Sequence, residues 1–356
     1  MVLLVFVHGY NLNERYMQPW TTPGESLTFT SFTEYFLANG IFRFRIPMLF
    51  IISGFLYAMH DQIPNKQRIP KRLRTLLIPY LLWSAFGLLL TFALEFFPYT
   101  RNLVAGSHIV QVDQSRLLVH DYRWYEIAGR WLFFPVSYQL WFIRVLLIYN
   151  LAYPALRWCV THPTAQLVFF SIVTLLWIST EGFIFFEGEG LLFFSMGIWM
   201  QKTNFNIETP NRWLRPGSWG LVFILFSVAK TWLAFEGEAI LGNAVYPILT
   251  IMHKLVVVSG LVACWYGLDR LVGWAMSRSW FVWLSAFSFF IYTMHVPIVA
   301  FAIDGVLAWL PPISSYRILT FIFLPLTVIA VSIGTGALFR SILPKTYSIL
   351  TGGRGI

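Results

Sequence analysis

The chain has 356 residues, of which 57% are hydrophobic and only 12% are charged. Soluble domains carry roughly a quarter charged residues, and a soluble fold cannot hide this much apolar surface inside one core. The composition therefore excludes an ordinary soluble enzyme and predicts an integral membrane protein, in which a helix needs about 20 apolar residues to cross the bilayer.

The net charge of +9 is compatible with a nucleic-acid-binding protein, but the distribution of the charges is not. Lys and Arg lie in short connections between apolar runs, which is how a membrane protein is oriented, so membrane lipid and not nucleic acid is the expected partner. No metal-binding HExxH, P-loop, GxGxxG or GxSxG motif occurs. We therefore expect no metal and no bound cofactor.

The apolar runs predict an all-α, polytopic transmembrane helical bundle of about ten spans in a single domain, residues 1–356. The first span, residues 1–10, is only partial, which indicates an internal start at Met1, a truncated segment or a half-buried one. Nine full spans are predicted at roughly 37–58, 75–97, 138–157, 165–182, 188–201, 218–235, 244–267, 281–303 and 315–339.

The connections between these spans alternate in charge, which predicts their orientation. The connection after the first full span carries Lys66, Arg68, Lys71, Arg72 and Arg74, whereas the alternate connections are less basic or acidic. Because basic loops stay in the cytoplasm, these residues are expected on the cytoplasmic side. The longest outer loops are then about 11–36 and 98–137.

Five ionisable side chains lie inside the predicted spans or at their ends: His8, Arg43, Arg45, Arg144 and His295. Charged groups inside a membrane are costly, so each is a candidate functional residue. With a rise of about 1.5 Å per residue, His295 lies roughly 20 Å from the cytoplasmic edge, and the three arginines lie roughly 9–12 Å from the outer edge. With His8 at the outward end of its segment, the depths predict one shared polar cavity, open toward the outside.

Each of these residues also has a purely structural interpretation. Arginines near a helix end can extend to the membrane surface, His295 can be a neutral histidine bonded to a neighbouring helix, and His8 can simply mark the surface. Lys230 is expected to extend to the outer surface. The pair His253 and Lys254 is interpreted as packing or pathway residues, and His120 as a solvated loop residue.

Five segments of the chain carry short motifs, in chain order 47–56 (PMLFIISGFL), 71–80 (KRLRTLLIPY), 140–142 (LWF), 193–197 (FFSMG) and 288–297 (SFFIYTMHVP). Together they resemble the membrane acyltransferase 3 family, which includes O-antigen acetylases and glucan biosynthesis protein C. Their order and spacing extend over nearly the whole chain. The family's first span carries an arginine, ten residues and then a catalytic histidine. His8 fits that histidine, and the arginine would fall before Met1.

The resemblance implies transfer of an acyl group, acetyl or succinyl, from acyl-CoA to a hydroxyl of a cell-envelope carbohydrate in the bacterial inner membrane. His8 is then the base, because imidazole titrates near neutrality. Arg45 and Arg144 stabilise the negative charge that develops, and His295 assists or orients. The family often has His-Met-Pro where this chain has Arg45-Ile46-Pro47, a difference that bears on the donor or the acceptor.

Two further sets of residues are assigned to the substrates. Arg72 and Arg74, at the cytoplasmic mouth, are expected to meet the anionic coenzyme A. Arg43, Trp124 and Trp141 are expected to contact the carbohydrate acceptor, since aromatic side chains offer flat faces to a sugar, although an interfacial aromatic belt explains the tryptophans equally well.

The alternative function is a transporter or flippase for an anionic or glycan substrate, because buried Arg and His also suit a substrate pathway. This hypothesis predicts substrate accumulation without a covalent acyl product, and no inverted repeat supports it. A third possibility, a structural scaffold, needs no buried charge cluster. Consumption of acyl-CoA by purified protein separates the first hypothesis from the other two.

Overall fold

The computed structural model describes residues 1–14, 16–113 and 115–355, and the described part contains helices and no named strand. The predicted all-α, polytopic fold is confirmed. The chain forms two compact units, each built from separate stretches of sequence. Because the positions of the chain's parts relative to one another are not determined, we describe each unit by itself.

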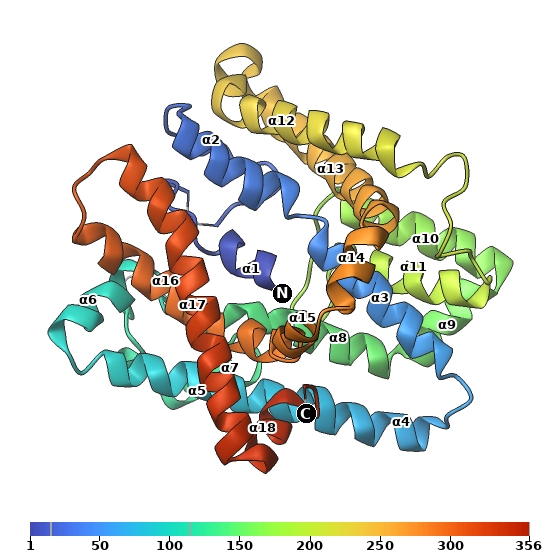
Figure 1. The fold of residues 1–356 in the computed structure, drawn as a ribbon, viewed down its shortest axis with the longest axis horizontal. Coiled ribbons are helices and arrows are strands. Elements are labelled where there is room, and N and C mark those ends of the chain that lie inside the picture. Colours follow the sequence, from blue (N-terminus) through green and yellow to red (C-terminus); the bar gives the residue numbers. More distant parts are fainter. Residues whose placement is uncertain (15, 114, 356) are drawn as a thin grey trace. The chain divides into compact units, whose positions relative to one another are not determined.

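The first unit comprises Met1–Asn11, Lys71–Arg144 and Ser279–Ile356. In this unit α16 and α17 run side by side and both contact α1 (Figure 1). Its helices are α1 (Val2–Val7), η2 (Leu73–Leu77), α5 (Ile78–Leu94), α6 (Pro98–Gly106), η3 (Val119–Asp121), α7 (Trp124–Leu132), η4 (Tyr138–Leu140), α15 (Ser279–Ser285), α16 (Ser288–Ala308), α17 (Ser314–Ile342) and α18 (Pro344–Thr351).

The second unit comprises Leu12–Pro70 and Val145–Arg278. Two helices cross the boundary in sequence, α4 (Asn65–Arg72) and α8 (Trp141–Leu151). The others are α2 (Phe29–Tyr35), η1 (Phe36–Ile41), α3 (Arg45–Met59), α9 (Tyr153–Thr161), α10 (Pro163–Ile178), α11 (Gly188–Lys202), α12 (Pro216–Leu241), η5 (Gly242–Ala244), α13 (Val245–Gly267) and α14 (Asp269–Met276). The long helices α12 and α13 pack along one another (Figure 1).

Within the described residues, five helical stretches are long and apolar enough to cross a membrane. A sixth is possible if α8 and α9, bent by 67°, form one span. The five are Phe29–Met59, Asn65–Leu94, Pro216–Gly267, Ser288–Ala308 and Ser315–Ile342. The predicted spans at 165–182 and 188–201 correspond to α10 and α11, which have 16 and 15 residues.

Several predicted boundaries differ from the structure, and two of the differences have a local cause. The first full span was expected to begin near residue 37, but the helix begins at Phe29 because the Thr28 side chain accepts a hydrogen bond from the Ser31 backbone N–H and caps it. The span expected at 281–303 is interrupted, since α15 ends at Ser285 and α16 begins at Ser288. Both differences arise from local caps and turns, which hydropathy does not register.

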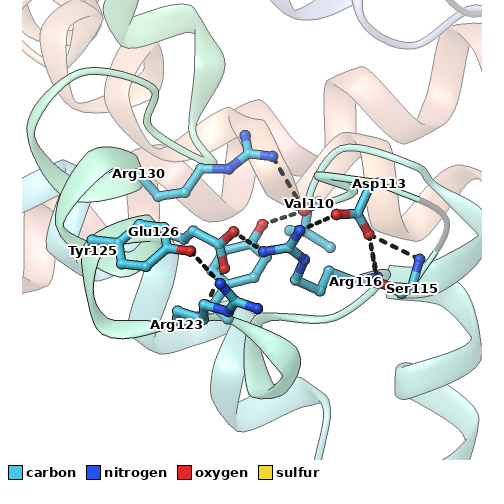
Figure 2. Close-up of polar contacts among 9 residues, drawn as sticks. Val110, Asp113, Ser115, Arg116, Arg123, Tyr125, Glu126 and Arg130 are labelled. Carbon is cyan, nitrogen blue, oxygen red and sulfur yellow. Dashed lines mark hydrogen bonds and ion pairs between the residues drawn. The ribbon is translucent and has the colours of Figure 1, made fainter.

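The predicted outer loop 98–137 has its own structure. α7 lies along α5, where Ser84 Oγ donates to the carbonyl of Trp131 at 2.7 Å. Figure 2 shows the polar contacts that hold the rest of this segment: Arg116 lies between Asp113 and Glu126, and Arg130 donates to the Val110 carbonyl at 3.1 Å. The hydrogen bond from Arg116 holds the pKa of Asp113 well below its usual value. The segment is therefore ordered by its own ion pairs.

Two of the motif segments meet in the second unit, where α3 packs against α11. A Cβ atom added at Gly54 would lie 2.0 Å from the carbonyl oxygen of Phe194, and one added at Gly197 would lie 2.1 Å from that of Ile51. Small residues allow helix backbones to approach closely in membranes. The SGF and FFSMG segments therefore serve helix packing in this protein.

Candidate active site

Two imidazole rings lie next to each other in the first unit. His8 follows the last residue of α1, and its Nδ1 lies 2.8 Å from the hydroxyl of Tyr138 in η4. The centre of its ring lies 5.4 Å from that of His295. The sequence predicted that His8 and His295 lie together, and the structure brings them together. Tyr138, which links η4 to His8, was not predicted.

The orientation of His295 is set by its own helix. Its ring is completely buried, and Nδ1–H donates to the carbonyl of Ile291 at 3.1 Å. A carbonyl can only accept, so Nδ1 carries the hydrogen, and in the neutral ring Nε2 carries the lone pair. The second histidine of the pair is therefore held in a single tautomer.

The kink of α16 holds η4 in place beside this pair. At Val296 the backbone leaves the helical conformation, with φ −105° and ψ 135°. The side chain of Gln139 donates to the carbonyls of Thr293 and Val296, at 3.0 and 3.1 Å, and the Tyr292 hydroxyl donates back to the Gln139 carbonyl. Since Gln139 is adjacent to Tyr138, the same contacts fix the tyrosine that reaches His8.

Arg144 supplies a positive charge on α8. Its Nε atom is buried and has no hydrogen-bond partner among the described residues, and the charge lies within electrostatic range of Tyr80. A guanidinium with an unused donor can stabilise an oxyanion. Trp141 lies one turn earlier and makes an edge-to-face contact with Phe142, with ring centres 6.3 Å apart.

The residues predicted to bind the acyl donor lie near the C-terminal end of the chain. Arg72 is partly buried, and Arg74 is exposed. Arg354 donates to the carbonyl of Thr75 at 3.0 Å and lies over the ring of Phe289 at 4.6 Å. Burial, together with the nearby charge of Arg72, lowers the pKa of Arg354 to about 10. Arg354 therefore adds a cation to this region that sequence reasoning did not assign.

Arg43 and Arg45 belong to the second unit. Arg43 Nη2 donates to the carbonyl of Met17 at 2.6 Å, and Arg45 donates to the carbonyl of Phe42. The Nε atom of Arg45 is buried with no hydrogen-bond partner among the described residues. The two histidines and Arg144 lie in the first unit, so the cavity predicted for all five ionisable side chains stays a prediction.

One interpretation of the other titratable residues was wrong. Lys230 does not extend to the surface: it is completely buried, and its Nζ lies 2.7 Å from the Asn39 carbonyl and 3.1 Å from Nδ1 of His253. The carbonyl lies in η1, a π-helical segment that hydropathy cannot reveal. His120 is exposed, as expected, and its Nδ1 also contacts the buried carboxylate of Glu95 at 2.5 Å.

Trp124, proposed as a sugar-binding residue, lies on α7 with 80% of its surface exposed. Its ring contacts Tyr125 edge to face, with centres 5.8 Å apart. The exposed face is compatible with binding a sugar ring and equally with an aromatic belt, so this role also stays a prediction.

The fold is that of a polytopic membrane protein, and its first unit holds an imidazole pair, which suits proton transfer, and the partly buried Arg144. The family model described as "Acyltransferase domain" matches residues 1–333, and the chain belongs to this family. The resemblance seen in the motifs is thus confirmed. The chain is 24% identical over 359 residues to the succinoglycan biosynthesis protein ExoH of Rhizobium meliloti (strain 1021), covering 99% of this chain and 89% of that protein. No solved structure matches the chain.

Proposed function

We propose that the protein transfers an acetyl or succinyl group from acyl-CoA to a hydroxyl of a cell-envelope carbohydrate, in the bacterial inner membrane. The observation that carries this proposal is the contact of His8 with Tyr138 and His295 in a chain of the acyltransferase family. Its relative ExoH is named for succinoglycan biosynthesis, which supports a carbohydrate acceptor.

In the proposed reaction, Nε2 of His8 takes the proton of the acceptor hydroxyl as its oxygen attacks the thioester carbonyl. The carbon–sulfur bond then breaks, and the thiolate of coenzyme A takes the proton back from the imidazolium. This role requires the tautomer in which Nδ1–H of His8 donates to the oxygen of Tyr138, 2.8 Å away, so that Nε2 carries the lone pair.

The other charged residues have supporting roles. Arg144 stabilises the oxyanion of the tetrahedral intermediate through its unused Nε donor, and His295 orients or assists the base. Arg45, whose Nε is likewise unused, stabilises charge in the second unit. Arg43, Trp124 and Trp141 are proposed to bind the acceptor.

The central test is the His8→Ala variant, purified and reconstituted in vesicles with acetyl-CoA or succinyl-CoA and a glycan acceptor. Because loss of a general base costs roughly 100- to 10,000-fold in rate, we expect acyl transfer to fall by that amount. The release of free thiol and the mass of the glycan measure it. His162→Ala, at an exposed histidine, is the control. A normal rate in His8→Ala would remove His8 from the mechanism.

Binding of the acyl donor is tested separately. The phosphates of coenzyme A are proposed to bind Arg72, Arg74 and Arg354. Replacing each by Gln removes a charge-assisted hydrogen bond, so the KM for acyl-CoA should rise by roughly tenfold with a smaller effect on kcat. Arg278→Gln, at an exposed arginine, is the matched control. An unchanged KM in all three variants would argue against donor binding here.

The same vesicles separate an acyltransferase from a transporter. Accumulation of unmodified glycan without thiol release would support the transporter hypothesis. Thiol release together with an acylated glycan supports the proposed function.

A further inference from the structure

The second unit contains a cavity of about 490 Å³ between α10, α11 and α13. Its wall includes Phe170 of α10, Leu192 and Met196 of α11, and Val258 of α13. Small-molecule sites range from roughly 300 to 1,000 Å³, so the cavity is large enough to hold a ligand. None of its lining residues has a role in the proposed acyl transfer, and the imidazole pair lies in the other unit.

Three polar groups of the wall, on Trp177, Trp265 and Tyr266, are already engaged. Trp265 Nε1 donates to the carbonyl of Ile207 at 2.9 Å, and the Tyr266 hydroxyl donates to that of Asn206 at 3.2 Å. Trp177 Nε1 donates to the carboxylate of Glu189 at 3.2 Å. These residues therefore present only their rings to the cavity. The rest of the wall is mostly apolar, with Gln166, Thr174 and Trp199 as its other polar side chains. A sugar or a nucleotide would therefore replace few of its hydrogen bonds to water, whereas a hydrocarbon chain has none to replace.

The cavity also lies where a lipid chain can reach it. α13 is part of the apolar stretch Pro216–Gly267, which is long enough to cross a membrane. α10 carries strongly exposed apolar residues, with Leu167 at 73% and Leu175 at 65% exposure. In a membrane such faces contact acyl chains. The helices that enclose the cavity therefore have lipid on their outer side.

The connection between α11 and α12 closes one end of the cavity with Phe205 and Leu214. Arg212 and Arg215 flank Leu214 in sequence, and both are exposed. Residues 203–215 contain these two arginines and one carboxylate, Glu208, so the connection carries a net positive charge. A positive segment at the end of an apolar cavity is complementary to a phosphate joined to a hydrocarbon chain.

We propose that this cavity holds one acyl chain of an anionic glycerophospholipid, with the lipid phosphate on Arg212 and Arg215. The lipid is a bound component of the second unit, distinct from the donor and the acceptor of the proposed reaction. The apolar wall selects the chain, and the two arginines select the charge of the headgroup.

The full-length protein in nanodiscs tests the proposal, with phosphatidylglycerol that carries a photoactivatable diazirine at its acyl chain. Mass spectrometry of peptides should locate labelling on the cavity-lining parts of α11 and α13. Leu192→Trp fills the cavity and should lower this labelling by roughly tenfold, whereas Leu167→Trp, on the exposed face of α10, should leave it unchanged. Met196→Phe is a smaller filling change, to be used if Leu192→Trp lowers the melting temperature.

The preference for an anionic headgroup is tested with phosphatidylcholine that carries the same photoactivatable chain. Wild-type protein should be labelled more strongly by the anionic lipid, by roughly fivefold for each arginine that contacts the phosphate. Replacing Arg212 and Arg215 by Gln should abolish this preference. Equal labelling of a folded cavity-filled variant and the wild type, or no preference of the wild type for phosphatidylglycerol, would overturn the proposal.

Discussion

Two histidine contacts in the protein differ in their partners. In the first unit, His8 faces the neutral hydroxyl of Tyr138 and the ring of His295. In the second unit, His253 faces the amino group of Lys230 across 3.1 Å. A protonated lysine only donates hydrogen bonds, so Nδ1 of His253 accepts when Lys230 carries its charge.

The comparison indicates that the partner separates a histidine suited to proton exchange from one that holds helices together. The Lys230 contact joins α12 to α13 and, through the carbonyl of Asn39, to η1. Asn39, Lys230 and His253 are all buried, and each makes a hydrogen bond to another of the three. The His8 contact involves a hydroxyl, which can donate or accept, and this freedom suits an acid–base role.

The largest difference is expected between the alanine variants of His295 and His253. His295→Ala should lower acyl transfer by roughly 100-fold, because the ring that orients or assists the base is lost. His253→Ala should retain the wild-type rate per folded molecule and lose thermal stability instead. The measurements are the rate of thiol release and the unfolding temperature of each purified variant. Equal loss of activity in both variants would show that the two histidines do not differ in their roles.

An intermediate effect is expected for Lys230→Met. The substitution keeps much of the side-chain volume but leaves the carbonyl of Asn39 and Nδ1 of His253 without a donor. The free energy of unfolding should fall by about 2 kcal/mol, since buried unpaired acceptors are costly. Unfolding in mixed micelles measures the change, and Lys345→Met, at an exposed lysine, is the control.

The double variant Lys230→Met with His253→Phe sharpens this prediction. It removes one of the two unpaired acceptors and should regain part of the lost stability. A double variant with the full summed loss would show that the contact between the two side chains is not what stabilises α12 against α13.

The smallest effect is expected for Tyr138→Phe, which removes only a hydroxyl. Without the oxygen that accepts from Nδ1–H, both the tautomer and the imidazolium of His8 are less stabilised. The rate should fall by roughly tenfold, equivalent to about 1.4 kcal/mol, and the acid limb of the pH–rate profile should move toward lower pH. A lower rate with an unmoved profile would indicate that Tyr138 has only a packing role.

The sequence predicted the helical membrane fold because lipid imposes long apolar runs. Charge inside those runs also singled out His8 and His295. Lys230 was misjudged because the rule that a long cation extends to the surface does not register an internal acceptor. Tyr138 was missed because a tyrosine at a span edge is indistinguishable from an interfacial residue, and Arg354 because a terminal arginine looks like any cytoplasmic charge. Contacts of this kind depend on where separate helices meet.

The close approach of α3 and α11 has a mechanical consequence. At Gly54 and Gly197 one backbone lies directly on the carbonyl oxygens of the other, with no flexible side chains between them that could rearrange as the helices slide. Close-packed interfaces resist continuous deformation. Any movement of the second unit during turnover must therefore carry these two helices as one rigid body, and its hinges must lie in the connections beyond their ends.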